Sequence, residues 1–441
     1  MSGITAFLKK DISFKKPSTK AEASKAEAPK TEAPSPQAEA AASQAETVAP
    51  AEEKQQKDAK ASKRGLSMKR GPSVSLPKPA RKQRRSTSAN SSGRHKQLVG
   101  LSVGSSQLAA AVVVNNGRPK LVKAARHALP FDIVAGGEVR DSEALANEIA
   151  TFFDAADLPR KNVRLGIGSS RTGVRVFERP VVDDPKQLAN AIRFRAYETL
   201  PIPMEEAMLD YQIVEEANAP DRVLLAVAYR DLVDRYAETC TAAKIELVGM
   251  DIEAFALLRA VGGEPLAAGE RAEAARVAVS IGFDRTTVAV SDGRVCEFTR
   301  VLDWGGARVT AAIQQALEVD AGEAERIKRS LDISANAPAE PGDEQTLRAA
   351  DAARREVNGL ARELASSLHF YQDQPNSLGF AEITITGGGA HLQGLAGQLE
   401  ELIGISVRVA DPFARVGSGH GISSDGQDGS LAVAIGLGIE D

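Results

Sequence analysis

The chain has 441 residues, with 55 Lys/Arg and 59 Asp/Glu for a formal net charge of −4. Its longest apolar run, residues 108–114, is far shorter than the roughly 20 residues that span a bilayer. The N-terminus, MSGITAFLKK, lacks the apolar core and cleavage site of a signal peptide. Neither Cys240 nor Cys296 has a cysteine or histidine at metal-ligand spacing, so free buried thiols are expected rather than a disulfide framework. We therefore expect a cytoplasmic protein.

Residues 1–97 are predicted to form a disordered basic tail. Residues 17–60 repeat Ala, Glu, Lys, Pro, Ser and Gln, with almost no large apolar side chain to offset the entropy of ordering. Residues 1–98 hold 21 Lys/Arg against 9 Asp/Glu, so a basic tail precedes an acidic body. The tail has no aromatic side chain among its arginines for base stacking, and nucleic acid is therefore not an expected partner.

One stretch of the tail is amphipathic. Apolar residues recur at helical spacing among lysines near the N-terminus, which indicates a short helix that could contact a membrane surface or another protein. The alternative is an inert, frayed end. These apolar residues are Ile4, Phe7, Leu8 and Ile12.

The folded part begins near residue 98 with two β-rich runs separated by Asn115, Asn116 and Gly117, a turn typical of a hairpin. A helix over residues 142–156 and two strands follow, and Asp184 with Pro185 then opens a second helix. A further strand and helix lead to the polar stretch 262–275, which is predicted to connect two lobes.

The second half repeats the pattern of the first. Residues 275–302 again read as strand, glycine turn, strand, tight turn and strand, about 180 residues after the first copy. Helices are predicted at 305–317, 321–330 and 346–372, before a strand at 381–386. The pattern predicts an α/β protein with duplicated lobes: lobe I from 98–270 plus 420–441, and lobe II from 271–419.

Three glycine-bearing turns each leave a predicted strand. Glycine lets backbone amides approach phosphate closely, and neighbouring hydroxyls add donors, so two facing hairpins could hold a polyphosphate. A third turn would lie at the base and ribose. The predicted ligand residues are Gly104, Ser105 and Ser106 in the first turn, Gly282, Thr286 and Thr287 in the second, and Gly387, Gly388 and Gly389 in the third.

The chain resembles the actin, Hsp70 and sugar-kinase superfamily, and within it the PilM family of type IV pilus assembly. The resemblance is carried by VGLSVGSS (99–106), GGEVRDSEAL (136–145), IRFRAYETLPIPMEEAMLDYQIV (192–214), ELVGMDIEAFALLRA (246–260) and ITITGGGAHLQGLAGQLEELIGISVRVADPF (383–413). It implies actin-like, ribonuclease H-like lobes around a nucleotide cleft that holds ATP and Mg²⁺. It also implies a small inserted SHS2 subdomain at about residues 169–235.

The resemblance implies roles for further residues. Glu325 and Lys328 match the region that reaches ribose and base, and the alternative for them is an ordinary surface ion pair. Asp251 matches a cleft-facing position that would suit a catalytic carboxylate. The alternative for Asp251 is a helix N-cap. Asp284 could accept amide hydrogen bonds within the second turn.

Departures from the family pattern concern hydrolysis. The family usually carries an Asp before each phosphate-loop glycine, at the Mg²⁺-associated positions, where this chain has Ser102 and Ser280. Ala109 stands where a Lys is usual. Loss of two carboxylates and a cation removes charge that phosphoryl transfer needs, so ATP binding is expected but hydrolysis is doubtful.

The function that the resemblance implies is that of a cytoplasmic adaptor, associated with the inner face of the plasma membrane through its partners. It would hold the N-terminal peptide of the inner-membrane protein PilN, at a strand edge in RTGVRVFERPVV, and join the inner-membrane pilus platform. Alternatives are an FtsA-like cell-division scaffold, which the apolar and acidic ending SLAVAIGLGIED disfavours, a small-molecule kinase, and a nucleotide-free scaffold.

Overall fold

The computed structural model describes residues 95–200, 202–216, 219–267, 270, 272–334, 344–418 and 427–440, all within one compact unit. The predicted tail lies outside the described residues up to position 94, together with its amphipathic stretch. Strand β1, the first described element, begins at Gln97. No helix in the described ranges is long and apolar enough to cross a membrane.

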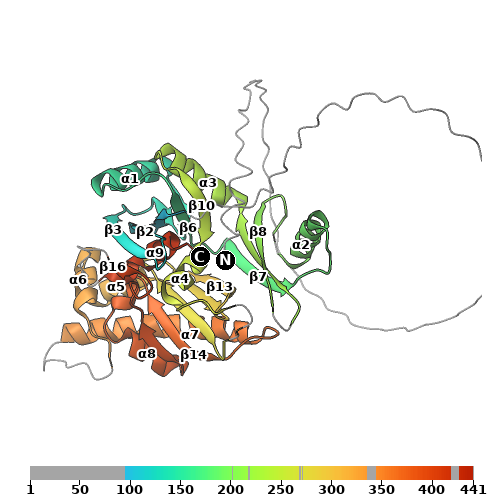
Figure 1. Ribbon diagram of the computed structural model, residues 1–441. Helices are drawn as coiled ribbons and strands as arrows, with labels where there is room; N and C mark the ends of the chain where they lie inside the picture. Colours follow the sequence, from blue (N-terminus) through green and yellow to red (C-terminus); the bar gives the residue numbers. More distant parts are fainter. Residues whose placement is uncertain are drawn as a thin grey trace, which may run out of the picture. The chain divides into compact units, whose positions relative to one another are not determined.

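Lobe I is built on a six-stranded sheet with the order β10-β6-β1-β2-β3-β16 (Figure 1). Strands β1, β2 and β3 are antiparallel, whereas β6 and β10 run parallel to β1. Gly117 has φ +85° in the turn between β2 and β3, as the hairpin prediction requires. The strands are β1 (Gln97–Val103), β2 (Gln107–Val114), β3 (Lys120–Ala128), β6 (Val163–Ile167), β10 (Leu247–Ile252) and β16 (Gly417–Ser418).

Helices cover both faces of this sheet, because alternate residues of each strand point to opposite sides. On one face, Leu101 and Leu108 pack with α1 (Ser142–Ala155) and α3 (Arg230–Ala242), which lie side by side in Figure 1. On the other face, Ala111 packs with α9 (Ala432–Gly438), next to α4 (Glu253–Val261). A short ladder of β4 (Val134–Ala135) and β5 (Glu138–Val139) precedes α1.

Lobe II repeats this plan. Its five-stranded sheet has the order β13-β12-β11-β14-β15, again with three antiparallel strands followed by two parallel ones. The duplication predicted from the sequence is therefore confirmed. Its strands are β11 (Ala275–Ile281), β12 (Thr286–Ser291), β13 (Cys296–Leu302), β14 (Phe380–Thr386) and β15 (Ser406–Val409).

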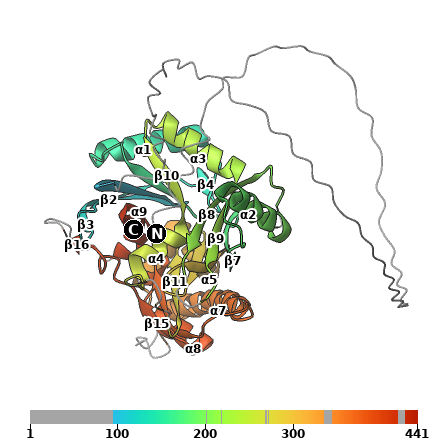
Figure 2. The same cartoon turned by 45° about the vertical axis from the view of Figure 1, so that its right-hand side comes forward.

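The helices of lobe II fall close to their predicted positions. They are α5 (Gly306–Leu317), α6 (Ala321–Ser330), α7 (Glu344–Gln372) and α8 (Leu395–Ile403), with the 3₁₀ turn η2 (Gly388–His391); a second 3₁₀ turn, η3 (Asp428–Leu431), precedes α9 in lobe I. Helices α7 and α8 lie together beside β15 in Figure 2. Buried side chains of α5 and α7 pack on the sheet, and Val279 and Leu360 belong to this core.

A separate three-stranded antiparallel sheet, with the order β7-β9-β8, forms the inserted subdomain. Asp184 caps its helix by accepting from the amides of Lys186 and Gln187, and Pro185 follows in the first turn as predicted. Leu188 and Ile192 of the helix pack on the sheet. The elements are β7 (Thr172–Glu178), α2 (Pro185–Thr199), β8 (Ala207–Val214) and β9 (Arg222–Tyr229).

Three details differ from the sequence-based expectation. The inserted sheet ends at Tyr229, short of residue 235, because α3 packs with α1 in lobe I. The chain returns to the lobe I sheet at Gly417 in β16, before residue 420. Strand β7 lies against β13, so lobe II flanks the strand to which a peptide was expected to add. The other edge strand of the inserted sheet is β8.

Candidate functional site

Two hairpins and a glycine turn line a cleft of about 1170 Å³ between the lobes. In the first hairpin the Gly104 amide donates to the Gln107 carbonyl (2.9 Å), and in the second the Gly282 amide donates to the Arg285 carbonyl (2.9 Å). The duplication thus extends to the turns themselves. The cleft gathers most of the predicted ligand residues: Ser102, Gly104, Ser105, Ser106, Ser280, Gly282, Glu325, Lys328, Gly387, Gly388 and Gly389.

Ser105 carries a polar group that the described part of the chain leaves unsatisfied. The residue is buried, with 6% of its surface exposed, and its hydroxyl has no hydrogen-bond partner there. A buried hydroxyl without a partner is costly, and such groups in native proteins usually meet a ligand or water. Ser105 lines the cleft at the first glycine turn, so its hydroxyl suits an anionic oxygen.

Arg285 brings positive charge to the back of the cleft. Its Nη2 atom donates to the Val103 carbonyl of lobe I (3.1 Å) and its Nη1 atom to the Asp284 carboxylate (3.3 Å). Burial opposes its charge, but the attraction of Glu253 and other neighbours raises the pKa of Arg285. The guanidinium therefore stays charged inside the protein.

Glu253, at the start of α4, lies beside this guanidinium and also lines the cleft. Burial raises the pKa of Glu253, while the charge of Arg285 partly offsets that effect. A buried Arg and Glu together keep the local charge near neutral. The positive charge that Arg285 offers a phosphate is thus reduced.

The opposite wall comes from α5 and α6. Lys328 donates to the Thr310 hydroxyl (2.8 Å) and to the Gly306 carbonyl (3.2 Å), and it pairs with Glu325 (2.6 Å). Burial opposes the Glu325 charge, but hydrogen bonds from Lys328 and Thr310 hold the pKa of Glu325 below its usual value. The predicted pair is therefore an ordered, charged wall of the cleft.

The third turn joins the two lobes. Gly387 has φ +90°, which favours glycine, and its amide donates to the Gly429 carbonyl of η3 (3.2 Å). A Cβ atom on Gly387 would come within 2.4 Å of the Ile281 carbonyl oxygen. In contrast, a Cβ atom on Gly388 would meet nothing within 4 Å. The turn thus has one glycine held by packing and one that faces open space.

The structure places three of the predicted site residues elsewhere. Thr286 is buried and donates to the Trp304 carbonyl (2.7 Å), and Thr287 lies beside Glu253. Neither residue lines the cleft, because β12 begins at Thr286 and both side chains are buried in the core. Asp251 pairs with Arg259 and lines a different cavity. Ile252 stands at the N-cap of α4, so the N-cap alternative for Asp251 is also wrong.

Asp284 corrects a further expectation. It was expected to accept amide hydrogen bonds inside its own turn. Instead, its Oδ2 atom accepts from the Gly136 amide of lobe I (2.7 Å), which ties the two lobes at the mouth of the cleft.

A second, smaller cavity of about 80 Å³ lies where the inserted sheet meets both lobes. Gln212 of the edge strand β8 and Met250 of the edge strand β10 share its wall, with apolar Leu224 and Phe255. Five arginines line it as well: Arg164, Arg259, Arg276, Arg294 and Arg415. Two sheet edges that share a polar and apolar wall can take an extended chain between them.

Asp210 of β8 lies close to this cavity wall. Burial raises the pKa of Asp210 to about 7, against a smaller opposing effect of the Tyr211 amide, and Asp251 adds to the increase. The two carboxylates thus interact across the boundary between the inserted sheet and lobe I.

Sequence reasoning missed Glu253 and Arg285. The signals were present: Arg285 follows the second glycine turn in GFDRTT, and Glu253 comes two residues after Asp251. Within the described residues, no group of three or more His, Cys, Asp or Glu could hold a metal ion. Cys240 and Cys296 are buried and free, as expected, and burial raises the pKa of Cys240 to about 12.

The duplicated α/β lobes, the glycine-lined cleft and the inserted sheet define an actin-like protein. Residues 100–441 match the family described as Type IV pilus assembly protein PilM. The chain belongs to this family, as its sequence motifs predicted.

A solved structure with a TM-score above 0.5 supports the fold, and two further structures are more distantly similar. A structure described as a PilM-PilN type IV pilus biogenesis complex shares 24% identity over 78% of this chain and 98% of that chain, with a TM-score of 0.63. The ethanolamine utilization protein EutJ from Carboxydothermus hydrogenoformans shares 14% identity over 77% and 89% of the two chains, with a TM-score of 0.46. MreB5 of Spiroplasma citri bound to AMPPNP shares 12% identity over 78% and 95%, with a TM-score of 0.47.

Proposed function

We propose that this chain is a cytoplasmic adaptor of type IV pilus assembly, which binds ATP between its lobes and holds the N-terminal peptide of the inner-membrane protein PilN. Through that peptide it would associate with the pilus platform at the inner face of the plasma membrane. The family match supports the role in pilus assembly. A similar solved structure is a complex of PilM with PilN, which supports the choice of partner.

The Ser105 hydroxyl is the observation that carries the nucleotide proposal. It is buried, has no partner in the described part of the chain, and lies at a glycine turn that faces a second one. Phosphate oxygens between the turns would accept from this hydroxyl and from nearby backbone amides. Lys328 and Glu325 would then meet the ribose or base, and the open side of Gly388 would leave room for the ring.

The residues present fit a polyphosphate better than they fit a metal ion. Ser102 and Ser280 replace the family's aspartates, and Arg285 already pairs with Glu253 and Asp284. Mg²⁺ would therefore enter on the nucleotide, held by phosphate oxygens and water rather than by protein carboxylates. We assign no catalytic residue, and the proposed role is binding rather than hydrolysis.

A bulky side chain at Gly388 tests the nucleotide proposal. Gly388→Leu would project into the cleft without a clash, and we expect it to weaken ATP binding at least about tenfold by displacing the ring. Gly397→Leu on α8 is the matched control, because a Cβ atom there also meets nothing within 4 Å and the residue lies outside the cleft lining. Calorimetric titration with ATP and ADP, with and without Mg²⁺, measures both.

Two results would contradict this proposal. If the wild-type chain binds neither nucleotide, the cleft is a degenerate one and the protein is a nucleotide-free scaffold. If Gly388→Leu binds ATP as well as Gly397→Leu does, the nucleotide lies elsewhere.

For the peptide we propose the boundary between β8 and β10, in place of the edge of β7. Both strands end their sheets, and the wall that they share has apolar side chains for pockets and arginines for backbone carbonyls or carboxylates. Titration of the full chain with a synthetic PilN-type N-terminal peptide measures this binding, and hydrogen exchange locates it. Protection confined to β7 or absent from β8 and β10 would contradict the site.

A further inference from the structure

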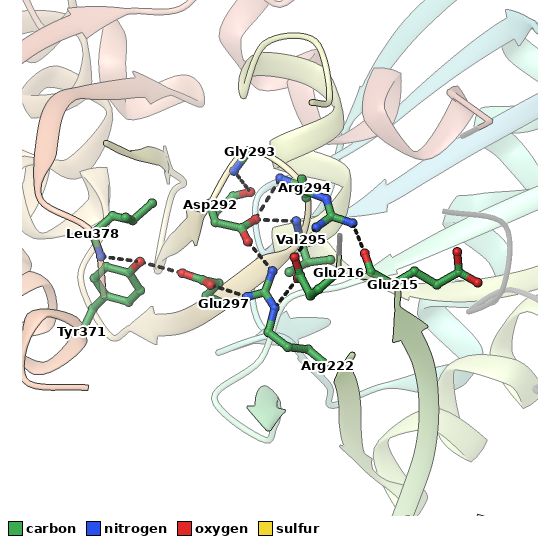
Figure 3. Close-up of polar contacts among 11 residues, drawn as sticks. Glu215, Glu216, Arg222, Asp292, Gly293, Arg294, Val295, Glu297, Tyr371 and Leu378 are labelled. Carbon is green, nitrogen blue, oxygen red and sulfur yellow. Dashed lines mark hydrogen bonds and ion pairs between the residues drawn. The ribbon is translucent and has the colours of Figure 1, made fainter. Parts of the chain in front are cut away.

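Arg222 is the centre of a partly buried charge network that joins the inserted sheet to lobe II (Figure 3). The residue begins β9, and its guanidinium pairs with Glu216 of its own subdomain (2.6 Å). It also pairs with Asp292 (2.6 Å) and Glu297 (2.7 Å), both from the β12–β13 hairpin of lobe II. One side chain thus crosses between two parts of the fold.

The partners of Arg222 are themselves held in place. Asp292 accepts from the amides of Arg294 and Val295, both at 2.8 Å, and only 8% of its side chain is exposed. Glu297 accepts from the hydroxyl of Tyr371 on α7 (2.6 Å). Because each acceptor is anchored to lobe II, Arg222 has little freedom to move relative to that lobe.

A second arginine makes the reverse connection, from lobe II to the inserted subdomain. Arg294 of lobe II pairs with Glu216 (2.7 Å) and donates to the carbonyl of Glu215 (2.6 Å), in the segment that leaves β8. Glu216 therefore pairs with Arg222 of the inserted subdomain and with Arg294 of lobe II. Two guanidinium groups and three carboxylates in fixed geometry make a specific lock rather than a loose surface contact.

The opposite end of the inserted sheet is continuous with lobe I. β6 leads into β7, and β9 leads directly into α3, which packs in the lobe I core. The subdomain is thus attached to lobe I by its chain. It is attached to lobe II by the Arg222 network and by apolar packing, in which β7 lies against β13 and Leu224 shares a core with Val295. Any rotation of one lobe against the other must either move the inserted sheet or break this network.

Strand β12 connects the network to the cleft. It begins directly after Arg285, at the second hairpin, and ends at Ser291, next to Asp292. It is paired on both sides, with β11 and β13, so it moves as a rigid strand of about 20 Å. A displacement of the second hairpin by a ligand would therefore reach Arg222.

We infer that the Arg222 network couples lobe II to the inserted subdomain, so that ATP in the cleft sets the affinity of the peptide groove between β8 and β10. This inference rests on the proposed function for its two ligands. Closure of the lobes would shift β8 relative to β10, because β8 follows lobe II through Glu215 and Glu216 while β10 stays in the lobe I sheet.

The test measures the affinity of the full chain for a PilN-type N-terminal peptide, with and without ATP, in the wild type and in variants. We expect Arg222→Met to reduce the effect of ATP on the peptide Kd to less than about twofold while ATP still binds. Glu216→Gln, which keeps the side-chain shape, should reduce it in part and serves if Arg222→Met does not fold. Arg179→Met is the matched control, because Arg179 pairs with Asp221 inside the inserted subdomain (3.4 Å).

A second measurement does not depend on either ligand. Spin labels at Asn190→Cys on α2 and Ser366→Cys on α7 report the distance between the inserted subdomain and lobe II, while the buried Cys240 and Cys296 stay unlabelled. We expect a narrow distance distribution in the wild type and in Arg179→Met, and a broader one in Arg222→Met.

The outcomes separate the two claims. Equal ATP effects in the wild type and Arg222→Met, or equal distance distributions, overturn the inference. A wild-type chain that binds ATP and peptide without any effect of one on the other overturns it as well. A chain that binds neither ligand overturns the proposed function. In that case the distance distributions alone show whether the Arg222 network fixes the inserted subdomain on lobe II.

Discussion

Arg285 and Asp210 each place an ionisable group at a boundary between parts of the fold, but Arg285 has partners for its charge and Asp210 does not have one for its Oδ2 atom. Arg285 is buried yet fully paired, by Glu253, Asp284 and the Val103 carbonyl. Asp210 is partly buried, and its Oδ2 atom has no hydrogen-bond partner among the described residues. The partners of Arg285 therefore keep its guanidinium charged, whereas the burial of Asp210 is not compensated and raises the pKa of its carboxyl group.

Asp210 predicts a pH-dependent stability. Its pKa, about 7 in the fold, exceeds the ordinary value of 3.8, so the folded chain binds more protons between these values and loses stability as pH rises through that window. Asp210→Asn removes this dependence. We expect the variant to gain on the order of 2 kcal/mol over the wild type between pH 4 and pH 8, after allowing for water that reaches the side chain.

Urea unfolding at a series of pH values measures the difference between the two free energies of unfolding. It should grow up to about pH 7 and stay level above it. A difference that does not change with pH would show that Asp210 ionises normally.

Helix α9 shows at the level of an element how close packing depends on small residues. A Cβ atom on Gly436 would come within 1.8 Å of the Ala256 carbonyl oxygen of α4, and one on Gly100 of β1 within 2.0 Å of the Ala434 carbonyl oxygen. The helix therefore lies in direct backbone contact with its neighbours. The Arg259 Nε atom also donates to the Gly436 carbonyl (2.9 Å).

Gly436→Ala should separate α4 from α9 and cost about 3 kcal/mol or more in the free energy of unfolding, because backbone atoms cannot yield as a flexible side chain does. Gly397→Ala in the first turn of α8 meets no atom within 4 Å and should instead gain about 0.5–1 kcal/mol from helix propensity. Thermal and urea unfolding measure the expected loss of stability in Gly436→Ala and the expected gain in Gly397→Ala. Equal effects of the two substitutions would contradict the packing argument.

At the scale of the whole molecule, the lobes meet in two places. Helix α4 of lobe I packs on β11 and β12 of lobe II in a buried apolar core that also includes Leu224 of the inserted sheet. At the mouth of the cleft, the Gly136 amide donates to Asp284, and the ring of Phe131 lies 5.5 Å from that of Phe283. Gly136 and Phe131 are exposed, unlike the shared core. Opening at the mouth should therefore be easier than movement of the inserted sheet.

Asp284→Ala tests this difference. Loss of a charge-assisted hydrogen bond worth about 1.5 kcal/mol should raise the exchange rate of the Gly136 amide about tenfold, while exchange in β9 stays unchanged. Hydrogen exchange with mass spectrometry or NMR measures both segments. The exposed Asp303→Ala is the control, and faster exchange in β9 as well would mean that the mouth and the inserted sheet open together.

Most elements, and the turns that line the cleft, could be predicted from the sequence. The two copies of strand, glycine turn and strand are local patterns, and Gly104, Gly282 and Gly388 stand where the chain must turn between recognisable elements. Whether the residues next to these turns are exposed or buried was harder to predict. Thr286 and Thr287 follow a phosphate-type turn, yet β12 starts at once and turns both side chains into the core.

The duplicated lobes and the cap of α2 could be predicted from the sequence, because periodicity, capping and turn chemistry act between residues a few positions apart, and the family was recognised from the resemblance of longer motifs. Which carboxylate reaches the cleft depends instead on the tertiary structure: the chain changes from strand to helix at Ile252, so Glu253 faces the cleft and Asp251 faces the second cavity. It also decided the lock at Arg222, whose partner Asp292 is 70 residues away. Such pairs depend on how sheets and helices pack, and no local pattern marks them.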